Sequence, residues 1–414
     1  MPPRKRAKSS APVTEVSTLW TRDVACVTGI APDGNGNVFA STSTSIHKIS
    51  DGVETVVAGG EEGGYADGPQ GMFSDILGFA VDAGGCLIVA EGEDGSRIRK
   101  VALDGQVSTV AGDPEGSAGY TDGQGAEARF NNPDAVAVDS DGNVLVADSR
   151  NHCIRKVAPD GTVSTLAGTP EEAGCQDGPA HEAGFNGPQG VAVDQEGNVF
   201  VADTGNGSIR KISREGAVST LAGSAEGESG HVDGAGDTAR FDAPVGLAVD
   251  ADGTIVVADN ENQSIRKVTP EGVVSTLAGP TASERGNNPR SSRTGYADGP
   301  ANTARFDSLF AVAIDADGNV LVADVYSVRM ITHTGLSRGV AVPRWPVGKP
   351  ALAANLLALL DDERFADVSF GAQALRALHA LTLRNRRACG TYTIRAPLLA
   401  PLARSLARPL ADAL

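Results

Sequence analysis

The sequence predicts an all-β protein whose main part is a closed six-bladed β-propeller. Three observations support this fold class: a repeat of about 56 residues, four strand-like segments in each repeat, and a spare strand-like segment ahead of the first repeat. Four antiparallel strands per unit, repeated around a ring, are typical of propellers. The high glycine content, 51 of 414 residues, agrees with the many turns that such a fold needs.

Two independent markers define the repeat. The aspartate of an AVD-like tripeptide recurs at Asp82, Asp139, Asp194, Asp250 and Asp315, with a degenerate copy at Asp33. The glycine of a (V/L)AG tripeptide recurs at Gly59, Gly112, Gly168, Gly223 and Gly279. Because both markers share one period, we expect six repeats of the same structural unit.

The fourth repeat shows the expected strands most clearly. Its first strand is the GVAV segment before Asp194, and the next three are residues 198–203, 208–212 and 217–223. The segments between them, DQEGN, DTGNG and SREG, are rich in residues that favour turns. The repeat therefore predicts a four-stranded antiparallel blade.

The N-terminus distinguishes a closed ring from an open solenoid. Residues 16–19 resemble the fourth-strand segment 163–166, yet they precede the first repeat, and the sixth repeat runs through 328–331 and then lacks that ending. A solenoid would instead carry atypical capping units at both ends. We therefore expect the N-terminal strand to complete the last blade and close the ring.

The repeats are also similar to a known family. Residues 136–157 (VAVDSDGNVLVADSRNHCIRKV) and 191–212 (VAVDQEGNVFVADTGNGSIRKI) resemble the NHL repeat. The resemblance covers about residues 14–340, and the first repeat departs most because it lacks AVD and VAD. It implies a six-bladed propeller that binds protein or RNA, as most members do, although a minority are enzymes.

Charge and composition divide the chain into three parts. Residues 1–13 form a basic tail that we expect to be disordered, residues 14–342 form the propeller, and residues 343–414 form a short helical, partly disordered extension. Residues 11–342 hold 21 basic and 47 acidic residues, a net charge of −26, whereas 343–414 carry a net +5. The acidic propeller argues against nucleic acid as its partner.

Several features favour an intracellular protein without a membrane segment. No apolar run reaches the length of about 18–20 residues that a membrane helix needs, no signal peptide is recognised, and the five cysteines are scattered. The segment Arg4–Lys8 resembles a short nuclear import signal, with a solvated basic tail as the alternative. The expected location is therefore cytoplasmic, nuclear or both.

The C-terminal part contains a second resemblance. Residues 351–360 read as a helix, and together with the following DDERFADVSF (361–370) they make the stretch of about residues 351–380 resemble the start of a BTB domain. This implies self-association or recruitment of a cullin-type ubiquitin ligase. After Phe370 the resemblance fades, and the remaining residues are too few for a complete domain. A basic amphipathic helix with a disordered tail is the alternative.

Loops predicted to lie on one face are the candidate binding site. In a four-stranded blade, the loops between strands two and three emerge beside the long inserts that lead into the next blade, and loops on a rigid scaffold often carry function. This face is asymmetric, because residues 20–29 lack an insert and residues 280–309 form the longest one. We expect a protein or peptide ligand here. The candidate residues are Asp148, Asn151, His152, Asp203, Asn206, Asp259, Asn262, Asp324, Arg285, Arg290 and Arg293.

Repetition itself supports a structural interpretation of several motifs. The Asp-x-x-Asn loops are expected to form Asx-type turns, and the Ile-Arg-Lys triplets are expected to pair with repeated aspartates. Each insert also holds one phenylalanine that we expect to fill the space between blades. These are Phe73, Phe130, Phe185, Phe241 and Phe306.

No motif predicts catalysis. The six histidines occupy mostly unrelated repeat positions, no loop has an EF-hand ligand series, and no GxSxG segment is present. We predict no catalytic residue, metal or cofactor. The expected function is a non-enzymatic interaction scaffold, and a substrate adaptor for ubiquitin ligation if the BTB resemblance holds. The alternatives are an RNA-binding NHL propeller that uses the 285–293 cluster, and a propeller lyase or hydrolase.

Overall fold

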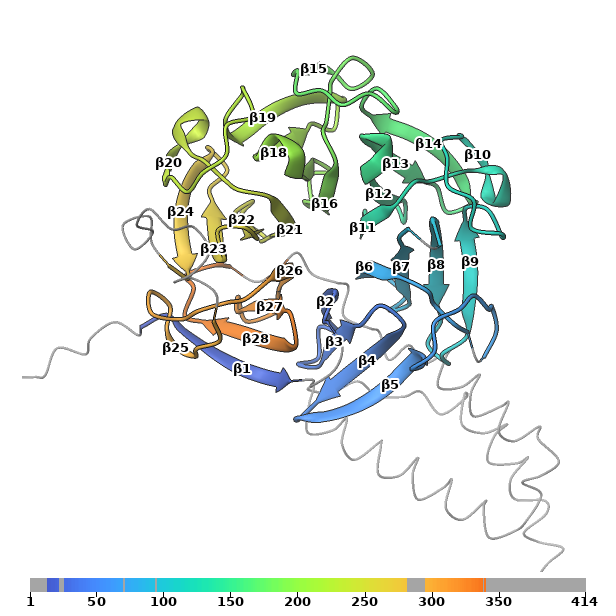
Figure 1. Cartoon of the computed structure of the whole chain (residues 1–414), viewed down its shortest axis with the longest axis horizontal. Coiled ribbons are helices and arrows are strands. Elements are labelled where there is room, and N and C mark those ends of the chain that lie inside the picture. The colour runs from blue at the N-terminus through green and yellow to red at the C-terminus, as the bar shows by residue number, and fades with distance from the viewer. Residues whose placement is uncertain are drawn as a thin grey trace, which may run out of the picture. The chain divides into compact units, whose positions relative to one another are not determined.

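The protein is represented by a computed structural model that describes residues 13–21, 26–69, 71–93, 95–280, 295–337 and 339. These residues form six antiparallel sheets that stand as blades around a ring (Figure 1). The prediction of an all-β six-bladed propeller is confirmed. Residues 1–12 of the predicted tail (1–13) and the whole predicted extension (343–414) lie outside the described residues.

Each blade runs from an inner strand to an outer strand. Blade 1 contains β2 (Gly29–Pro32), β3 (Val38–Ser41), β4 (Ser45–Ser50) and β5 (Val53–Gly59); blade 2 contains β6 (Ile76–Val81), β7 (Leu87–Glu91), β8 (Arg97–Val101) and β9 (Val107–Ala111); blade 3 contains β11 (Pro133–Val138), β12 (Val144–Asp148), β13 (Cys153–Val157) and β14 (Thr162–Ala167). Blade 4 contains β16 (Pro188–Val193), β17 (Val199–Asp203), β18 (Ser208–Ile212) and β19 (Ala217–Gly223); blade 5 contains β21 (Pro244–Val249), β22 (Ile255–Asp259), β23 (Ser264–Val268) and β24 (Val273–Ala278); blade 6 contains β26 (Leu309–Ile314), β27 (Val320–Asp324) and β28 (Ser327–Thr332).

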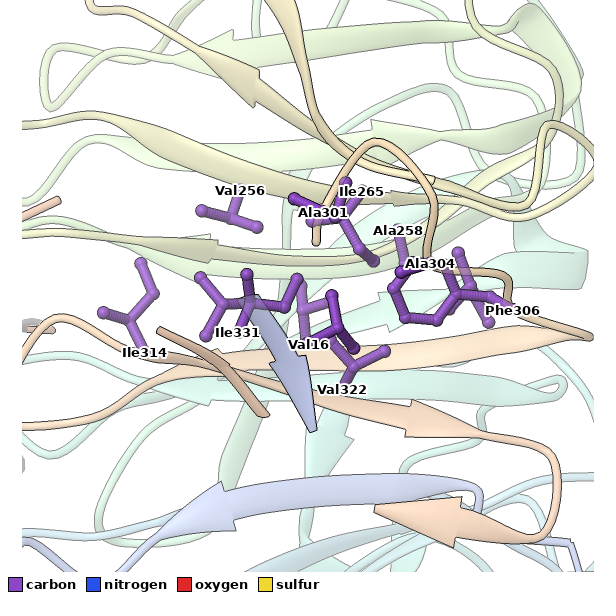
Figure 2. Packing of buried hydrophobic residues seen from close by; sticks show 14 residues of the cluster. Val16, Val256, Ala258, Ile265, Ala301, Ala304, Phe306, Ile314, Val322 and Ile331 are labelled. Atoms are coloured by element: carbon purple, nitrogen blue, oxygen red, sulfur yellow. The ribbon is translucent and has the colours of Figure 1, made fainter. Parts of the chain in front are cut away.

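The N-terminal strand closes the ring as predicted. Strand β1 (Glu15–Thr21) pairs antiparallel with β28, with Glu15 opposite Thr332 and Thr21 opposite Ser327, so it becomes the outer strand of blade 6. Val16 is buried in the cluster between blades 5 and 6 (Figure 2). One blade is thus built from both ends of the repeat region, which links the termini of the ring.

The inserts add short strands that were not predicted. Each insert leaves the outer strand of one blade, covers the outer edge of the next blade, and then leads into the inner strand of that next blade. We call the segment that covers this edge the cap. The caps are β10 (Gly123–Gln124) on β14, β15 (Gly178–Pro179) on β19, β20 (Gly234–Ala235) on β24, β25 (Gly299–Pro300) on β1, and Gly68 opposite Val107 on β9. Four sheets therefore have five strands.

The marker glycine at the end of each outer strand has a structural reason. Gly168 has φ = 104°, a conformation that favours glycine. A Cβ added there would lie 2.9 Å from the Cα of Cys153 on the neighbouring strand. Both the turn and the close approach therefore require glycine at this repeat position.

The core consists of six clusters, one at each junction between blades. Phe73, Phe130, Phe185, Phe241 and Phe306 are fully buried at five of these junctions, which confirms their predicted packing role. The cluster between blades 6 and 1 instead contains Val27, with Leu19 and Trp20 packed against it. This junction lies where the chain lacks an insert.

Candidate binding site at the channel mouth

The repeated carboxylates and arginines form buried networks inside the blades. In blade 3, Nη1 of Arg155 lies 2.8 Å from Oδ2 of Asp148, and both side chains are fully buried. Nη2 of Arg155 lies 2.6 Å from Oδ1 of Asp122 in the insert, and the guanidinium lies over the ring of Phe130. The corresponding pairs are Arg99–Glu91, Arg210–Asp203, Arg266–Asp259 and Arg329–Asp324. The expected pairing of these arginines with repeated acids is confirmed.

The asparagines of the Asp-x-x-Asn loops belong to the same networks. Nδ2 of Asn151 donates to Oδ2 of Asp148 at 2.8 Å and to the carbonyl of Gly119 at 2.9 Å. Burial raises the pKa of Asp148 to about 6, although a guanidinium contacts this carboxylate. The network therefore ties the loop after strand two to the insert.

Because they belong to these buried networks, most of the proposed binding residues have a structural role. Their side chains are buried, so they position the loops and do not face the solvent; they are Asp148, Asn151, Asp203, Asn206, Asp259, Asn262 and Asp324. Arg285, Arg290 and Arg293 lie outside the described residues. Among the described members of the proposed set, His152 alone has a partly exposed side chain.

His152 takes part in a ring of contacts that joins neighbouring blades. Its Nδ1 accepts a hydrogen bond from the backbone N–H of Gly187 at 3.0 Å. Every loop between strands two and three makes such a bond to the entry of the next blade. The six bonds are Ile76 N to Ser43 O (2.8 Å), Asn132 N to Ser96 Oγ (3.5 Å), Gly187 N to His152 Nδ1 (3.0 Å), Thr204 Oγ1 to Pro244 O (2.7 Å), Asn260 Nδ2 to Leu309 O (2.5 Å) and Val27 N to Val325 O (2.5 Å).

Inside this ring of bonds lies a cavity of about 430 Å³, which we call the mouth. It is lined by matching tripeptides at all six inner strands, together with Ala243, Asn260 and Glu261. Figure 1 shows these inner strands, β2, β6, β11, β16, β21 and β26, around the centre of the ring. The middle residue of each tripeptide is Gly or Ala, because neighbouring inner strands approach closely there. A Cβ on Gly190 would lie 2.1 Å from the carbonyl oxygen of Val245.

The first residue of each tripeptide differs from blade to blade. In ring order these residues are Thr28, Leu77, Asp134, Gln189, Val245 and Phe310. Blades 3 and 4 therefore offer polar side chains, whereas blades 5 and 6 offer apolar ones, with Phe310 38% exposed. A rigid ring with a polar arc and an apolar arc can select one orientation of a ligand.

Asp134 is the most unusual group of the mouth. Its Oδ1 accepts a hydrogen bond from Nδ2 of Asn132 at 3.1 Å, whereas its Oδ2 is buried and has no hydrogen-bond partner among the described residues. Burial, reinforced by the nearby charge of Asp75, raises the pKa of Asp134 to about 7. Buried polar atoms are normally satisfied, so an unsatisfied oxygen beside a cavity suits a donor from a ligand.

Sequence reasoning missed these mouth residues, although a signal was present. They stand five positions before each AVD-like aspartate, in a column that changes in every repeat while its neighbours stay small or apolar. Variation within an otherwise regular repeat marks a position that the scaffold leaves free for function.

The described part of the chain lacks two further kinds of site. No group of three or more His, Cys, Asp or Glu side chains there could hold a metal ion. Within the same ranges, no helix has the length and apolarity that crossing a bilayer requires.

Sequence comparisons match the repeats. The NHL repeat model matches residues 130–157 and 241–268, and the Teneurin NHL domain model matches residues 169–236. NHL repeat-containing protein 2 of Bos taurus is 30% identical over 293 residues, which cover 60% of this chain and 39% of that protein. Protein SUPPRESSOR OF QUENCHING 1, chloroplastic, of Arabidopsis thaliana is 34% identical over 180 residues, 40% of this chain and 17% of that protein. The matched region thus spans well under half of these relatives.

Structure comparisons agree on the fold. A structural genomics protein of unknown function from Bacteroides thetaiotaomicron has a TM-score of 0.57 and 20% identity, with 77% of this chain and 75% of that chain covered. A gluconolactonase from Xanthomonas campestris has a TM-score of 0.50 and 16% identity, with 77% and 89% covered. At these identities the likeness shows a shared propeller fold alone.

Proposed function

We propose that this NHL-type propeller is a non-enzymatic protein-interaction scaffold that binds a peptide segment of a partner at the mouth. The observation that carries this proposal is the mouth itself, where six variable residues surround a cavity of about 430 Å³ and one carboxylate oxygen is buried without a partner. Concave sites with mostly apolar walls and a few placed polar groups are typical of ligand sites.

The chemistry of the mouth specifies the peptide. Val245 and Phe310 offer apolar contact, and Asp134 offers an acceptor on the other side of the ring. Glu261 adds negative charge to the lining of the mouth. A lysine or arginine next to an apolar residue is therefore the motif that the mouth fits best.

The pKa of Asp134 makes this binding pH-dependent. At pH 6 the carboxyl is mostly protonated, and at pH 8 it is mostly ionised, because its pKa is about 7. A cationic ligand favours the ionised form, so affinity should rise as pH increases through 7.

The adaptor role in ubiquitin ligation and self-association through the C-terminus stay predictions. They depend on residues 361–370, which lie outside the described residues. Affinity capture with the full chain and with a chain that lacks residues 345–414 tests the adaptor role. A cullin-type scaffold should be captured by the full chain alone, and its absence from that capture would end the proposal.

The alternative functions have less support. RNA binding rests on Arg285, Arg290 and Arg293, which lie outside the described residues, and the acidic groups around the mouth would repel phosphate there. A lyase or hydrolase rests on a shared fold, which hosts many functions.

The mouth can be tested by comparing partner capture between variants of the full chain. Asp134→Asn combined with Phe310→Ser should lose specific partners, because both arcs of the mouth are altered. Glu215→Gln, at an exposed hairpin away from the mouth, serves as the control and should retain them. Partners that remain bound to the double variant would contradict the proposal.

A further inference from the structure

The outer edge of blade 1 differs from the outer edges of the other five blades. Those five edges are each paired with a cap. In the part of the chain that the structure describes, β5 pairs only with β4. Proteins normally protect an exposed strand edge, because it can accept another strand.

The aspartate directly before each cap forms specific bonds with the edge that the cap covers. In blade 3, Oδ2 of Asp122 accepts the backbone N–H of Thr165 at 3.1 Å, and Oδ1 of Asp122 accepts from Nη2 of Arg155 at 2.6 Å. Val163 lies beneath the cap and is 2% exposed. The threonine, the arginine and the buried valine thus form one set that holds the cap.

In blade 1, different residues occupy all three positions of this set. The strand register places His47 opposite Val56, as Arg155 is opposite Thr165 in blade 3. His47 therefore stands in the place of the arginine, Val56 in the place of the threonine, and Glu54 in the place of the buried valine. No insert with an Asp-Gly pair precedes this blade.

The replacement leaves an edge that is stable without a cap. Nε2 of His47 lies 2.7 Å from Oγ of Ser45, and Nδ1 of His47 lies 2.7 Å from Oε1 of Glu54. Trp20 of β1 adds to this group, because its ring lies near that of His47 and its Nε1 donates to Oε2 of Glu54 at 3.1 Å. By register, the N–H groups of Glu54 and Val56 point outward, and neither makes a hydrogen bond to any described residue outside the sheet.

Apolar and acidic groups surround this edge. Val53 and Val56 are 62% and 60% exposed. A second cavity, of about 600 Å³, lies beside the strand and is lined by residues 56–60, Glu61, Glu62 and Met72, among others. Its apolar floor of Val56, Val57 and Met72 is therefore flanked by two carboxylates.

We propose that the edge of β5 binds an extended segment of a partner protein, which adds antiparallel to blade 1 as a fifth strand. The five caps of the described chain show the geometry, because all five pair antiparallel with the equivalent strand. An apolar side chain of the partner packs on Val56 and Met72, and a lysine or arginine reaches Glu61 and Glu62. Main-chain bonds provide the affinity in this mode of recognition, and side chains provide the specificity. The site is separate from the mouth and does not depend on it.

A synthetic peptide of eight alternating lysine and valine residues is a suitable probe. Its binding to the full chain is measured by fluorescence anisotropy, and protection of the Glu54 and Val56 amides is measured by hydrogen exchange. An analogue with every backbone N–H methylated keeps the side chains and the charge but cannot pair as a strand. The analogue should bind at least tenfold more weakly, and equal binding would overturn the proposal.

Protein variants locate the site. Val56→Lys should weaken probe binding at least tenfold, whereas Val273→Lys, which adds the same charge to the exposed start of the capped strand β24, should leave it unchanged. Both variants are compared in an Asp134→Asn, Phe310→Ser background, because a peptide of lysine and valine also has the chemistry proposed for the mouth, and this background confines the measurement to the edge of β5. Equal losses in Val56→Lys and Val273→Lys would mean non-specific attraction of charge and would overturn the proposal. A dimer in light scattering that Val56→Lys converts to a monomer would show that a second copy, and not a partner peptide, covers the edge.

Discussion

Blade 3 and blade 1 share one backbone plan but differ in how their outer halves are stabilised. In blade 3, Arg155 joins Asp148 of its own sheet to Asp122 of the insert, so the cap and the blade form one unit. In blade 1, His47 contacts Ser45 and Glu54 of its own blade, and its ring lies near that of Trp20 in β1. The difference shows that the cap, the arginine and the threonine are retained or replaced together.

A joint replacement of this kind has a physical reason. An arginine left in blade 1 without the insert aspartate would keep a buried charge with fewer partners, which is costly. A threonine at position 56 would have no carboxylate to bond. Loss of the insert therefore removes the reason for both residues, and among the described residues β5 pairs with β4 alone.

The largest difference between the two blades should appear on truncation of the central residue. Arg155→Ala leaves Asp148 buried without its counter-charge, so we expect a loss of about 3–5 kcal/mol in the free energy of unfolding. His47→Ala removes hydrogen bonds to Ser45 and Glu54, and we expect about 1–2 kcal/mol. Urea unfolding followed by circular dichroism measures both. Equal losses would contradict the distinction between the blades.

A second difference lies at the mouth, where blade 3 has Asp134 and blade 1 has Thr28. The pKa of Asp134 in the folded protein is about 7, above its ordinary value of 3.8, so the folded state holds this proton to higher pH than the unfolded state does. Its contribution to stability is therefore complete below about pH 4 and is lost as pH rises through 7.

Asp134→Asn should remove this pH dependence. The stability advantage of the native protein over the variant should decrease from pH 4.5 to 7.5 and then stay constant, as measured by urea midpoints. Thr28→Val is the control, because a hydroxyl does not titrate in this range. Parallel curves for the native protein and Asp134→Asn would contradict the assigned pKa.

The smallest expected effect concerns the residue that receives the cap. Thr165→Val removes the hydroxyl that lies 3.3 Å from Oδ1 of Asp122 and 2.8 Å from the hydroxyl of Tyr120, so we expect a loss of about 1 kcal/mol. Val56→Thr in blade 1 should change stability by less than about 0.5 kcal/mol, because no cap is present there. Thermal unfolding of both variants checks this, and a gain of about 1 kcal/mol in Val56→Thr would reveal a cap on blade 1.

The fold was predictable because its signals repeat. Segment 208–212 was expected as a strand and is β18, and the displaced strand β1 was recognisable from residues 16–19. The caps were not predicted, because a strand of two residues has no periodic pattern of its own. Their position follows from long-range contacts such as Asp122 with Thr165, which no local pattern contains.

The site was predictable only in part for a similar reason. The Asp-x-x-Asn pattern predicted Asx-type turns, and this was wrong for Asp148, because its carboxylate accepts from the N–H of Asn131 in the insert and from the side chains of Asn151 and Arg155. The mouth was missed because Asp134 and its five counterparts share a position and not a residue type. Comparing the repeats for the column that varies, as well as for the columns that agree, would have located it.

Hydrogen exchange at single amides tests the central comparison most directly. The equivalent amides of Thr18, Thr109, Thr165, Thr220 and Thr276 all donate to a cap aspartate. The Val56 amide has no such acceptor in the described structure. In the free full-length protein, the Val56 amide should exchange at least about 100-fold faster than the five threonine amides, since an exposed edge gives little protection. Protection of Val56 equal to that of the threonines would contradict the account, because it would mean that blade 1 is already capped.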